Sequence, residues 1–424
     1  MRVLIINTSE RIGGAAIAAN RLMEALKKNG VKARMLVRDR QTDQMTVSCI
    51  RGSWLLPLKF VWERAIIWLN NGCRKRNIFQ VDIANTGTDV TKMFEFEQAD
   101  VIHLHWVNQG FLSIDNLTRI IHSGKPVVIT MHDMWYFTGI CHYSSGCNRY
   151  ETLCRSCPLV THGGIGCDLA RRVYNQKLTI YSDTQLAFVG CSQWITNLAS
   201  ASQLTKGHIV TNIPNAINTS LFRPTDMTHA RQKHHLPTDG RRLILFGSQR
   251  ITDERKGFRY LVDACWKIKQ NNPQLADNTA VVILGSKGDS VRQMLPFPVF
   301  TMDYISGEQD IMELYNAVDI FVTPSLQDNL PNTIVEAMAC GTPCVGFHVG
   351  GIPEMIDHLQ NGYVAEYMNA DDFSHGIEWC LDPERYDSLC TSARTKAQST
   401  YSEERIAHLY SEVYEMMLKK NKEK

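Results

Sequence analysis

Residues 319–336 carry side chains that could bind a ligand with phosphates between hydroxyl-bearing groups. A short apolar run predicts a buried strand that ends at Thr323, and a loop follows it. Pro331 stands where the first residue of a helix is expected. The free N–H groups at that helix start, at Asn332 and Thr333, would point back toward the strand ends. They would form a natural binding site for a phosphate.

Two carboxylates accompany this helix start. Glu336 lies about one and a half turns into the expected helix, where it could accept hydrogen bonds from a diol such as a ribose. Asp328, in the preceding loop, could do the same for the hydroxyls of a sugar. We interpret Asp328 and Glu336 as catalytic and donor-binding residues. The alternative is an acid at a helix start beside an unrelated surface aspartate.

A second loop, residues 247–257, directly follows another predicted buried strand and contains two cations. Arg250 could bind a diphosphate as a bidentate fork and Lys256 as a point charge. Alone, such a loop is usually a solvated surface. Its place in the same domain as the acids and the helix start favours diphosphate binding instead.

Strands alternating with helices must position these loops. The pattern implies a parallel sheet covered on both faces, with ligands at the carboxyl ends of its strands. The pattern occurs twice, so we expect two doubly wound, Rossmann-like α/β domains that face each other across a cleft. Strands are expected at residues 3–6, 32–37, 101–105, 127–131 and 187–191, then at 243–246, 280–284, 319–323, 344–347 and 363–365. Helices are expected at 15–28, 257–270, 310–317 and 331–339.

The pattern stops near residue 213, where we place the domain boundary. Residues 1–213 would form the first domain, and residues 214–401, which contain both ligand-binding loops, the second. An amphipathic helix at 402–422 would pack back on the first domain. A chain of 424 residues suits two cores of about 200 residues each.

The composition favours an ordinary globular protein, with 44% hydrophobic and 21% charged residues. A net charge of +2 gives no case for a nucleic-acid partner. No secretory signal is visible, and no apolar stretch reaches the roughly 18 residues of a membrane-spanning helix. The 13 cysteines are therefore expected to be reduced, and the protein cytoplasmic, with an additional candidate location at the inner face of the membrane.

The chain resembles a retaining glycosyltransferase of family 4, which has the GT-B fold. The resemblance rests on the acid-x7-Glu spacing of Asp328 and Glu336, on Pro324 and Ser325, and on residues 336–343 (EAMACGTP) and 350–354 (GGIPE). Residues 213–218 (IPNAIN) look like the interdomain hinge strand of that family. The resemblance implies transfer of a sugar from a nucleotide-diphosphate sugar to a glycan or lipid-linked acceptor, in cell-surface polysaccharide biosynthesis.

By matching position, the resemblance implies that Arg250 and Lys256 bind the diphosphate, Glu336 the ribose and Asp328 the sugar. Gly13 and Gly14, at the first strand-to-helix turn, would approach the donor from the other domain. The family usually has glutamate where this chain has Asp328. No Asp-x-Asp metal motif is present, so no cofactor is expected for catalysis.

Three histidines lie at or near strand ends of the first domain. The resemblance favours His132 as a catalytic residue that hydrogen-bonds the sugar or the acceptor; the alternative is a histidine bonded locally. His103 and His105 alternate along the preceding strand, and only His105 lies near its end, so both are weaker candidates.

Just beyond His132 come Cys141, Cys147, Cys154 and Cys157. The Cys-x2-Cys half has the spacing of a metal knuckle, and four thiolates would close a structural zinc site. His142 or Cys167 could substitute as a ligand. The alternative is a set of reduced, buried cysteines.

Residues 54–76 combine a segment rich in Trp, Leu and Ile with a basic run at Arg74, Lys75 and Arg76. This segment is a candidate for contact with a membrane surface or a lipid-linked acceptor. The alternative is packing within its own domain. For the whole chain, the competing functions are another GT-B activity, a sugar-nucleotide epimerase or a phosphorylase, and a zinc-stabilised nucleic-acid binder.

Overall fold

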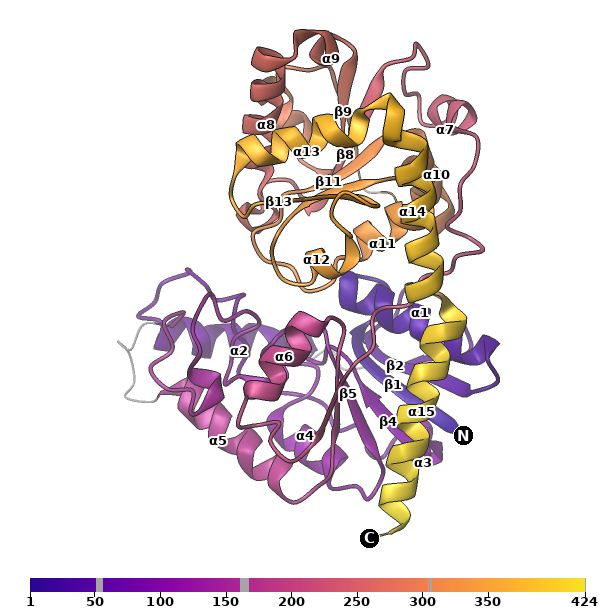
Figure 1. The fold of residues 1–424 in the computed structure, drawn as a ribbon. Coiled ribbons are helices and arrows are strands. Elements are labelled where there is room, and N and C mark those ends of the chain that lie inside the picture. Colours follow the sequence, from indigo (N-terminus) through magenta and orange to yellow (C-terminus); the bar gives the residue numbers. More distant parts are fainter. Residues whose placement is uncertain (51–55, 161–167, 304, 306, 424) are drawn as a thin grey trace. The chain divides into compact units, whose positions relative to one another are not determined.

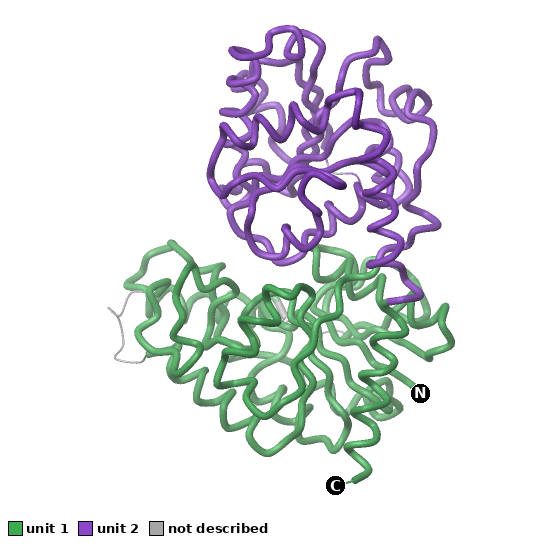
Figure 2. The backbone as a smooth tube through the Cα atoms, viewed as in Figure 1, with its two compact units in different colours: residues 1–216, 406–424 green, residues 217–405 purple. Residues whose placement is uncertain are grey.

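The computed structural model describes residues 1–50, 56–160, 168–303, 305 and 307–423. The chain divides into two compact units (Figure 2). Unit 1 comprises Met1–Ala216 and Ile406–Lys424, and unit 2 comprises Ile217–Arg405. The division falls three residues beyond the boundary expected from the sequence.

Unit 1 is built on a seven-stranded parallel sheet (Figure 1). The chain crosses back after one strand before it begins the next, so that successive strands run in the same direction. Val, Ile and Leu fill the central strands, which are buried on both faces. The order along the sheet is β3 (Val47–Cys49), β2 (Lys32–Asp39), β1 (Arg2–Ser9), β4 (Val101–Leu104), β5 (Val127–Met131), β6 (Ala187–Gly190) and β7 (Ile209–Asn212).

Helices surround this sheet: α1 (Gly14–Lys28), α2 (Leu56–Asn70), α3 (Phe94–Gln98), α4 (Ile114–Ile121), α5 (Leu169–Ser182) and α6 (Gln193–Ala201). The long helix α15 (Glu403–Lys422) also belongs to unit 1 over most of its length. Its buried residues Ile406, Tyr410 and Tyr414 share one hydrophobic cluster with Val3 and Ile5 of β1. The C-terminal helix therefore completes the core of the N-terminal sheet.

Unit 2 has a six-stranded parallel sheet in the order β10 (Val299–Met302), β9 (Thr279–Ser286), β8 (Arg242–Arg250), β11 (Ile320–Thr323), β12 (Cys344–Phe347) and β13 (Gly362–Ala365). Its helices are α7 (Met227–Lys233), α8 (Phe258–Asn271), α9 (Pro273–Asp277), α10 (Glu308–Ala317), α11 (Asn332–Ala339), α12 (Ile352–Met355), α13 (Ala370–Leu381) and α14 (Pro383–Tyr401). The predicted class, two doubly wound α/β domains, is confirmed.

In each unit the strand order reverses at one point, between β1 and β4 in unit 1 and between β8 and β11 in unit 2. The connections on either side of such a point run to opposite faces of the sheet, which leaves a crevice at the carboxyl ends of the strands. Ligands of doubly wound folds bind there, so the loops after these four strands are the ones to inspect.

The prediction of a hinge strand at residues 213–218 is wrong. The strand β7 ends at Asn212, and residues 213–216 have no regular structure. The Ile213 N–H still donates to the Gly190 carbonyl at 3.0 Å, and Ile217 forms an isolated bridge with Ser402. Pro214 has no N–H group and cannot donate to a strand ladder, which explains why the strand stops before it.

Candidate functional site at the strand-order reversals

The site in unit 2 is formed by the loops that follow β8 and β11, which are adjacent parallel strands. The first loop turns at Gly257, whose φ of 68° lies in the left-handed region. A Cβ atom at this position would lie 1.8 Å from the carbonyl oxygen of Pro324. Glycine is therefore required for the two loops to approach this closely.

Residue Arg255 connects the same two loops. Its carbonyl oxygen accepts a hydrogen bond from the Leu326 N–H at 2.8 Å, and its guanidinium donates to the carbonyl of Gln327 at 2.7 Å. These bonds fix the backbone of the second loop just before Asp328, so that the position of its carboxylate is set by the first loop.

Lys256 and Asp328 form an ion pair, with 2.6 Å between Nζ and Oδ2. Their side chains are only 23% and 13% exposed. Burial alone would raise the pKa of Asp328, but the charges of Lys256 and Arg255 outweigh it, and the net pKa is lowered. Asp328 is therefore a carboxylate at neutral pH, and two residues expected at one site are in direct contact.

The helix start expected to hold a phosphate is the N-terminus of α11, where Asn332 and Thr333 are half-buried. Glu336 lies further along α11 and is 6% exposed. One of its carboxylate oxygens accepts a hydrogen bond from the Tyr315 hydroxyl at 3.1 Å. Tyr315 therefore orients this carboxylate, and the ribose-binding role of Glu336 stays a prediction.

Arg250 is the last residue of β8 and is exposed. Its diphosphate-binding role also stays a prediction. The sequence reasoning overlooked Arg255, which is the neighbour of Lys256 and connects the loops. The strand order supplies the missing signal, since the loops after β8 and β11 must be adjacent and a second cation in one of them would face the acid in the other.

In unit 1, the loops after β1 and β5 carry the predicted residues. Gly13 has a φ of 94° and lies at the N-cap of α1, so the turn into this helix needs glycine. Gly14 begins the helix, and both glycines are exposed. Their proposed approach to the donor stays a prediction.

His132 directly follows β5, and both of its ring nitrogens face partners within unit 1. Its Nε2 lies 2.9 Å from Nδ1 of His105, and its Nδ1 lies 3.5 Å from the thiol of Cys191. Burial lowers the pKa of His132 to about 4. A neutral imidazole at physiological pH can exchange hydrogen bonds with a hydroxyl, but it does not supply positive charge.

His103 and the C-terminal helix are joined by hydrogen bonds. The ring nitrogens of His103 lie 2.8 Å from the Tyr414 hydroxyl and 2.7 Å from Oγ1 of Thr130. Thr130 in turn contacts the Tyr410 hydroxyl at 2.8 Å. His103 is thus a fully buried structural histidine beneath the strand ends.

The cysteines expected to bind zinc lie in the connection after β5. Cys141, Cys147, Cys154 and Cys157 all line one cavity. Cys167 lies outside the described residues. Among those described, no group of three or more His, Cys, Asp or Glu is arranged to hold a metal ion. Zinc binding by these four cysteines stays a prediction.

Comparison with known proteins finds a family model that matches part of the second unit. Residues 240–383 match the family model described as "Glycosyl transferases group 1", and this range includes Arg250, Lys256, Asp328 and Glu336. An uncharacterised glycosyltransferase of Methanocaldococcus jannaschii is 25% identical over 376 residues, 81% of this chain and 91% of that protein. The N-acetyl-alpha-D-glucosaminyl L-malate synthase of Bacillus anthracis is 32% identical over 118 residues, 27% of this chain. That match spans only 31% of the relative's own length.

Among solved structures, sucrose-phosphate synthase from Thermosynechococcus elongatus superposes with a TM-score of 0.66 at 19% identity, over 98% of each chain. At this identity the likeness concerns the fold alone. The chain therefore has the GT-B fold, and residues 240–383 of its second unit match the glycosyl transferases group 1 model.

Proposed function

We propose that the protein is a retaining glycosyltransferase of family 4. It would move a sugar from a nucleotide-diphosphate sugar to a glycan or lipid-linked acceptor in polysaccharide biosynthesis. The observation that carries the proposal is the contact of Lys256 with Asp328 at the strand-order reversal of unit 2, inside the matched family range. A cation, an acid and the start of α11 there suit a ligand with both phosphates and hydroxyls.

In the proposed mechanism, cleavage of the sugar–phosphate bond places negative charge on the leaving nucleotide diphosphate. Lys256 and Arg250, together with the N-terminus of α11, would stabilise that charge without reorganising. Asp328 would bind the sugar and Glu336 the ribose. His132, neutral at physiological pH, would hydrogen-bond a hydroxyl of the sugar or the acceptor. No bound metal or other cofactor enters these steps.

The first test is a thermal-shift screen with UDP-, GDP- and ADP-sugars. Only a ligand that binds the folded state raises the melting temperature, by an amount that grows with concentration over Kd. We expect one nucleotide series to stand out. The stabilising donor is then incubated with candidate acceptors, and NMR determines the anomeric configuration of the product. Inversion would contradict retention, and isomerisation or phosphorolysis without transfer would favour an epimerase or a phosphorylase.

A membrane surface is the partner that we propose for α2. Two ionisable side chains of this helix, Glu63 and Arg64, are buried, and Arg64 lies 3.0 Å from the buried carboxylate of Asp82. Its exposed side carries apolar residues at helical spacing, namely Leu58, Val61, Trp62, Trp68 and Leu69, of which Trp62 is 57% exposed.

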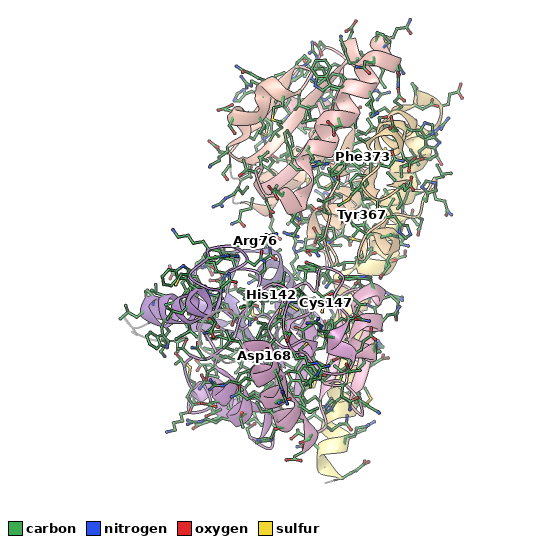
Figure 3. The ribbon with its side chains drawn as sticks, turned by 90° about the vertical axis from the view of Figure 1, so that its left-hand side faces the viewer. Arg76, His142, Cys147, Asp168, Tyr367 and Phe373 are labelled. Atoms are coloured by element: carbon green, nitrogen blue, oxygen red, sulfur yellow. The ribbon has the colours of Figure 1, made fainter. Side chains whose placement is uncertain are left out.

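A basic segment follows this apolar stripe. Arg74, Lys75 and Arg76 are all exposed (Arg76 is labelled in Figure 3), and exposed Phe79 lies close behind them in the chain. Apolar side chains inserted at the headgroup level, with cations beside them, suit an anionic lipid surface. Residues 51–55 of the predicted segment lie outside the described residues. Within the described part of the chain, no helix is both long and apolar enough to cross a bilayer. The proposed location is the cytoplasmic face of the membrane.

Replacing Trp62 by serine is expected to weaken binding to anionic vesicles about tenfold, because burial of a large apolar side chain is worth roughly 1.5–3 kcal/mol. Sedimentation with phosphatidylglycerol-containing and purely phosphatidylcholine vesicles measures the effect. Trp266→Ser is the matched control, since Trp266 is 47% exposed but lies on α8 of unit 2. Equal loss in both variants, or no binding of the unmodified protein to either vesicle, would contradict the membrane proposal.

A further inference from the structure

The connection between β5 and α5 holds four cysteines around one cavity. Over residues 138–159 this connection has little regular structure beyond the short 3-10 turn Arg149–Glu151. Cys141, Cys147, Cys154 and Cys157 nevertheless face a common cavity of about 20 Å³. That volume is enough for one occupant of the size of a water molecule. The path of the backbone therefore places four thiols from one loop around the same cavity.

Backbone N–H groups point at two of the four sulfurs. The Gly139 N–H donates to the Cys154 sulfur at 3.2 Å. The N–H groups of Leu159 and Val160, two and three residues after Cys157, lower the pKa of its thiol, although burial outweighs them. Hydrogen bonds of this kind favour the thiolate over the thiol. Burial nevertheless raises the net pKa of Cys141, Cys154 and Cys157, so these cysteines are thiols at neutral pH unless a metal ion binds them.

Positive charge surrounds the cavity. Arg149 and Arg155 line it. Lys177 of α5 is completely buried and donates to three backbone carbonyls, those of Trp135, Thr138 and Gly139. Burial lowers the pKa of Lys177 to about 7, and the nearby thiols of Cys154 and Cys141 and carboxylates of Asp82 and Asp133 partly oppose this shift. A buried ammonium is costly unless anions accompany it.

We propose that Cys141, Cys147, Cys154 and Cys157 together bind one zinc ion, with Lys177 compensating the charge of the complex. Binding converts four thiols to thiolates and releases four protons, which leaves a complex with two negative charges. Four protein ligands close the tetrahedral shell, so the site is structural. Binding requires the loop to rearrange, since no three ligating side chains among the described residues are arranged to hold a metal ion. The ion would link Cys147 and Cys157 to Cys141 and Cys154, which already belong to the hydrophobic cluster of unit 1.

The site resembles a structural zinc knuckle in ligand chemistry but is independent of the sugar-transfer proposal. It lies in unit 1, in the loop that also contains His142, whose Nδ1 contacts Asp133 at 2.8 Å (Cys147 and His142 are labelled in Figure 3). Loss of zinc would loosen this loop, whereas failure of the donor-site proposal would leave the zinc content unchanged. The two proposals are therefore separable by experiment.

The test is metal analysis of the intact, purified protein by mass spectrometry. About one zinc per chain is expected, and Cys154→Ser and Cys157→Ser should each lose it. Cys73→Ser is the control, because Cys73 is exposed and lies outside the loop. Iron in place of zinc, or an unchanged zinc content in the Cys154 and Cys157 variants, would overturn the proposal.

Ligand variants can fail to fold, so the unmodified protein carries a second measurement. Titration with an organomercurial should release zinc in step with the modification of four thiols. Cobalt exchanged into the site should show the sulfur-to-metal charge-transfer absorption of a thiolate complex. Protein that is metal-free as isolated, with four freely reactive thiols or two disulfides in this loop, would refute the site.

Discussion

Replacing Lys256 or Arg250 by alanine is expected to lower the rate of sugar transfer at least about a hundredfold, the usual effect of removing one preorganised group that stabilises transition-state charge. Lys256 lies at the strand-order reversal, with its Nζ 2.6 Å from Oδ2 of Asp328, and Arg250 ends β8, the strand that leads into the Lys256 loop. Both would face the leaving diphosphate, whose charge grows in the transition state. The loss should therefore appear mainly in kcat rather than in KM.

The two variants differ in their effect on stability, which provides an internal check. Lys256→Ala leaves the Asp328 carboxylate with Arg255 at 3.8 Å and the Ser325 hydroxyl at 3.4 Å, so some loss of stability is expected. Arg250 is exposed, so its variant should melt like the unmodified protein. Lys267→Ala, on the exposed side of α8, is the activity control. Near-normal transfer by both site variants would exclude the assigned donor site.

The second large effect is a loss of stability in acid that depends on His103. Burial lowers the pKa of His103 from 6.5 to about 3. As the pH falls below 6.5 the unfolded chain takes up a proton that the folded chain refuses, so the free energy of unfolding decreases. The decrease amounts to about 1.4 kcal/mol per pH unit, or about 3 kcal/mol between pH 6.5 and 4.

Denaturant unfolding of the unmodified protein and of His103→Gln at several pH values measures this contribution. The variant should be less stable at pH 7, since it loses contacts with Tyr414 and Thr130, but its stability should fall less steeply below pH 6.5. Other groups, such as Glu63, whose pKa burial raises to about 9, are common to both proteins and cancel in the comparison. His408→Gln, on the exposed face of α15, is the control. Identical slopes for His103→Gln and the unmodified protein would contradict the buried, neutral histidine.

Much of the fold could be predicted because the central strands are buried on both faces. Their runs of Val, Ile and Leu, as in β1 and β11, stand out in the sequence. The missed strands β3, β7 and β10 are the outermost strands of their sheets, and most of their residues are only half-buried. A strand with one free edge and partial burial has no strong apolar signal, which explains why the pattern overlooked it.

The candidate site shows a similar limit. Strand ends and a helix start drew attention to Lys256 and Asp328, but their contact joins residues 72 positions apart and follows from strand order. The burial of Glu63 and Arg64 in α2 could not be predicted from the sequence either. Glu63 and Arg64 look like a solvated pair in the sequence, and only their contact with Asp82, which comes from the loop before β4, explains their burial. Whether such a residue is buried depends on contacts with residues that are distant in the chain.

The division of the chain has a consequence for synthesis on the ribosome. Residues 217–405 lie between the two segments of unit 1, and α15 supplies Ile406, Tyr410 and Tyr414 to the core beneath β1. Unit 2 emerges as one continuous stretch and can close its core as soon as it leaves the exit tunnel. Unit 1 begins first but must wait, with the apolar surface that α15 covers still open, until the whole of unit 2 has been translated. The nascent chain thus has an interval in which its first sheet would need protection by a chaperone.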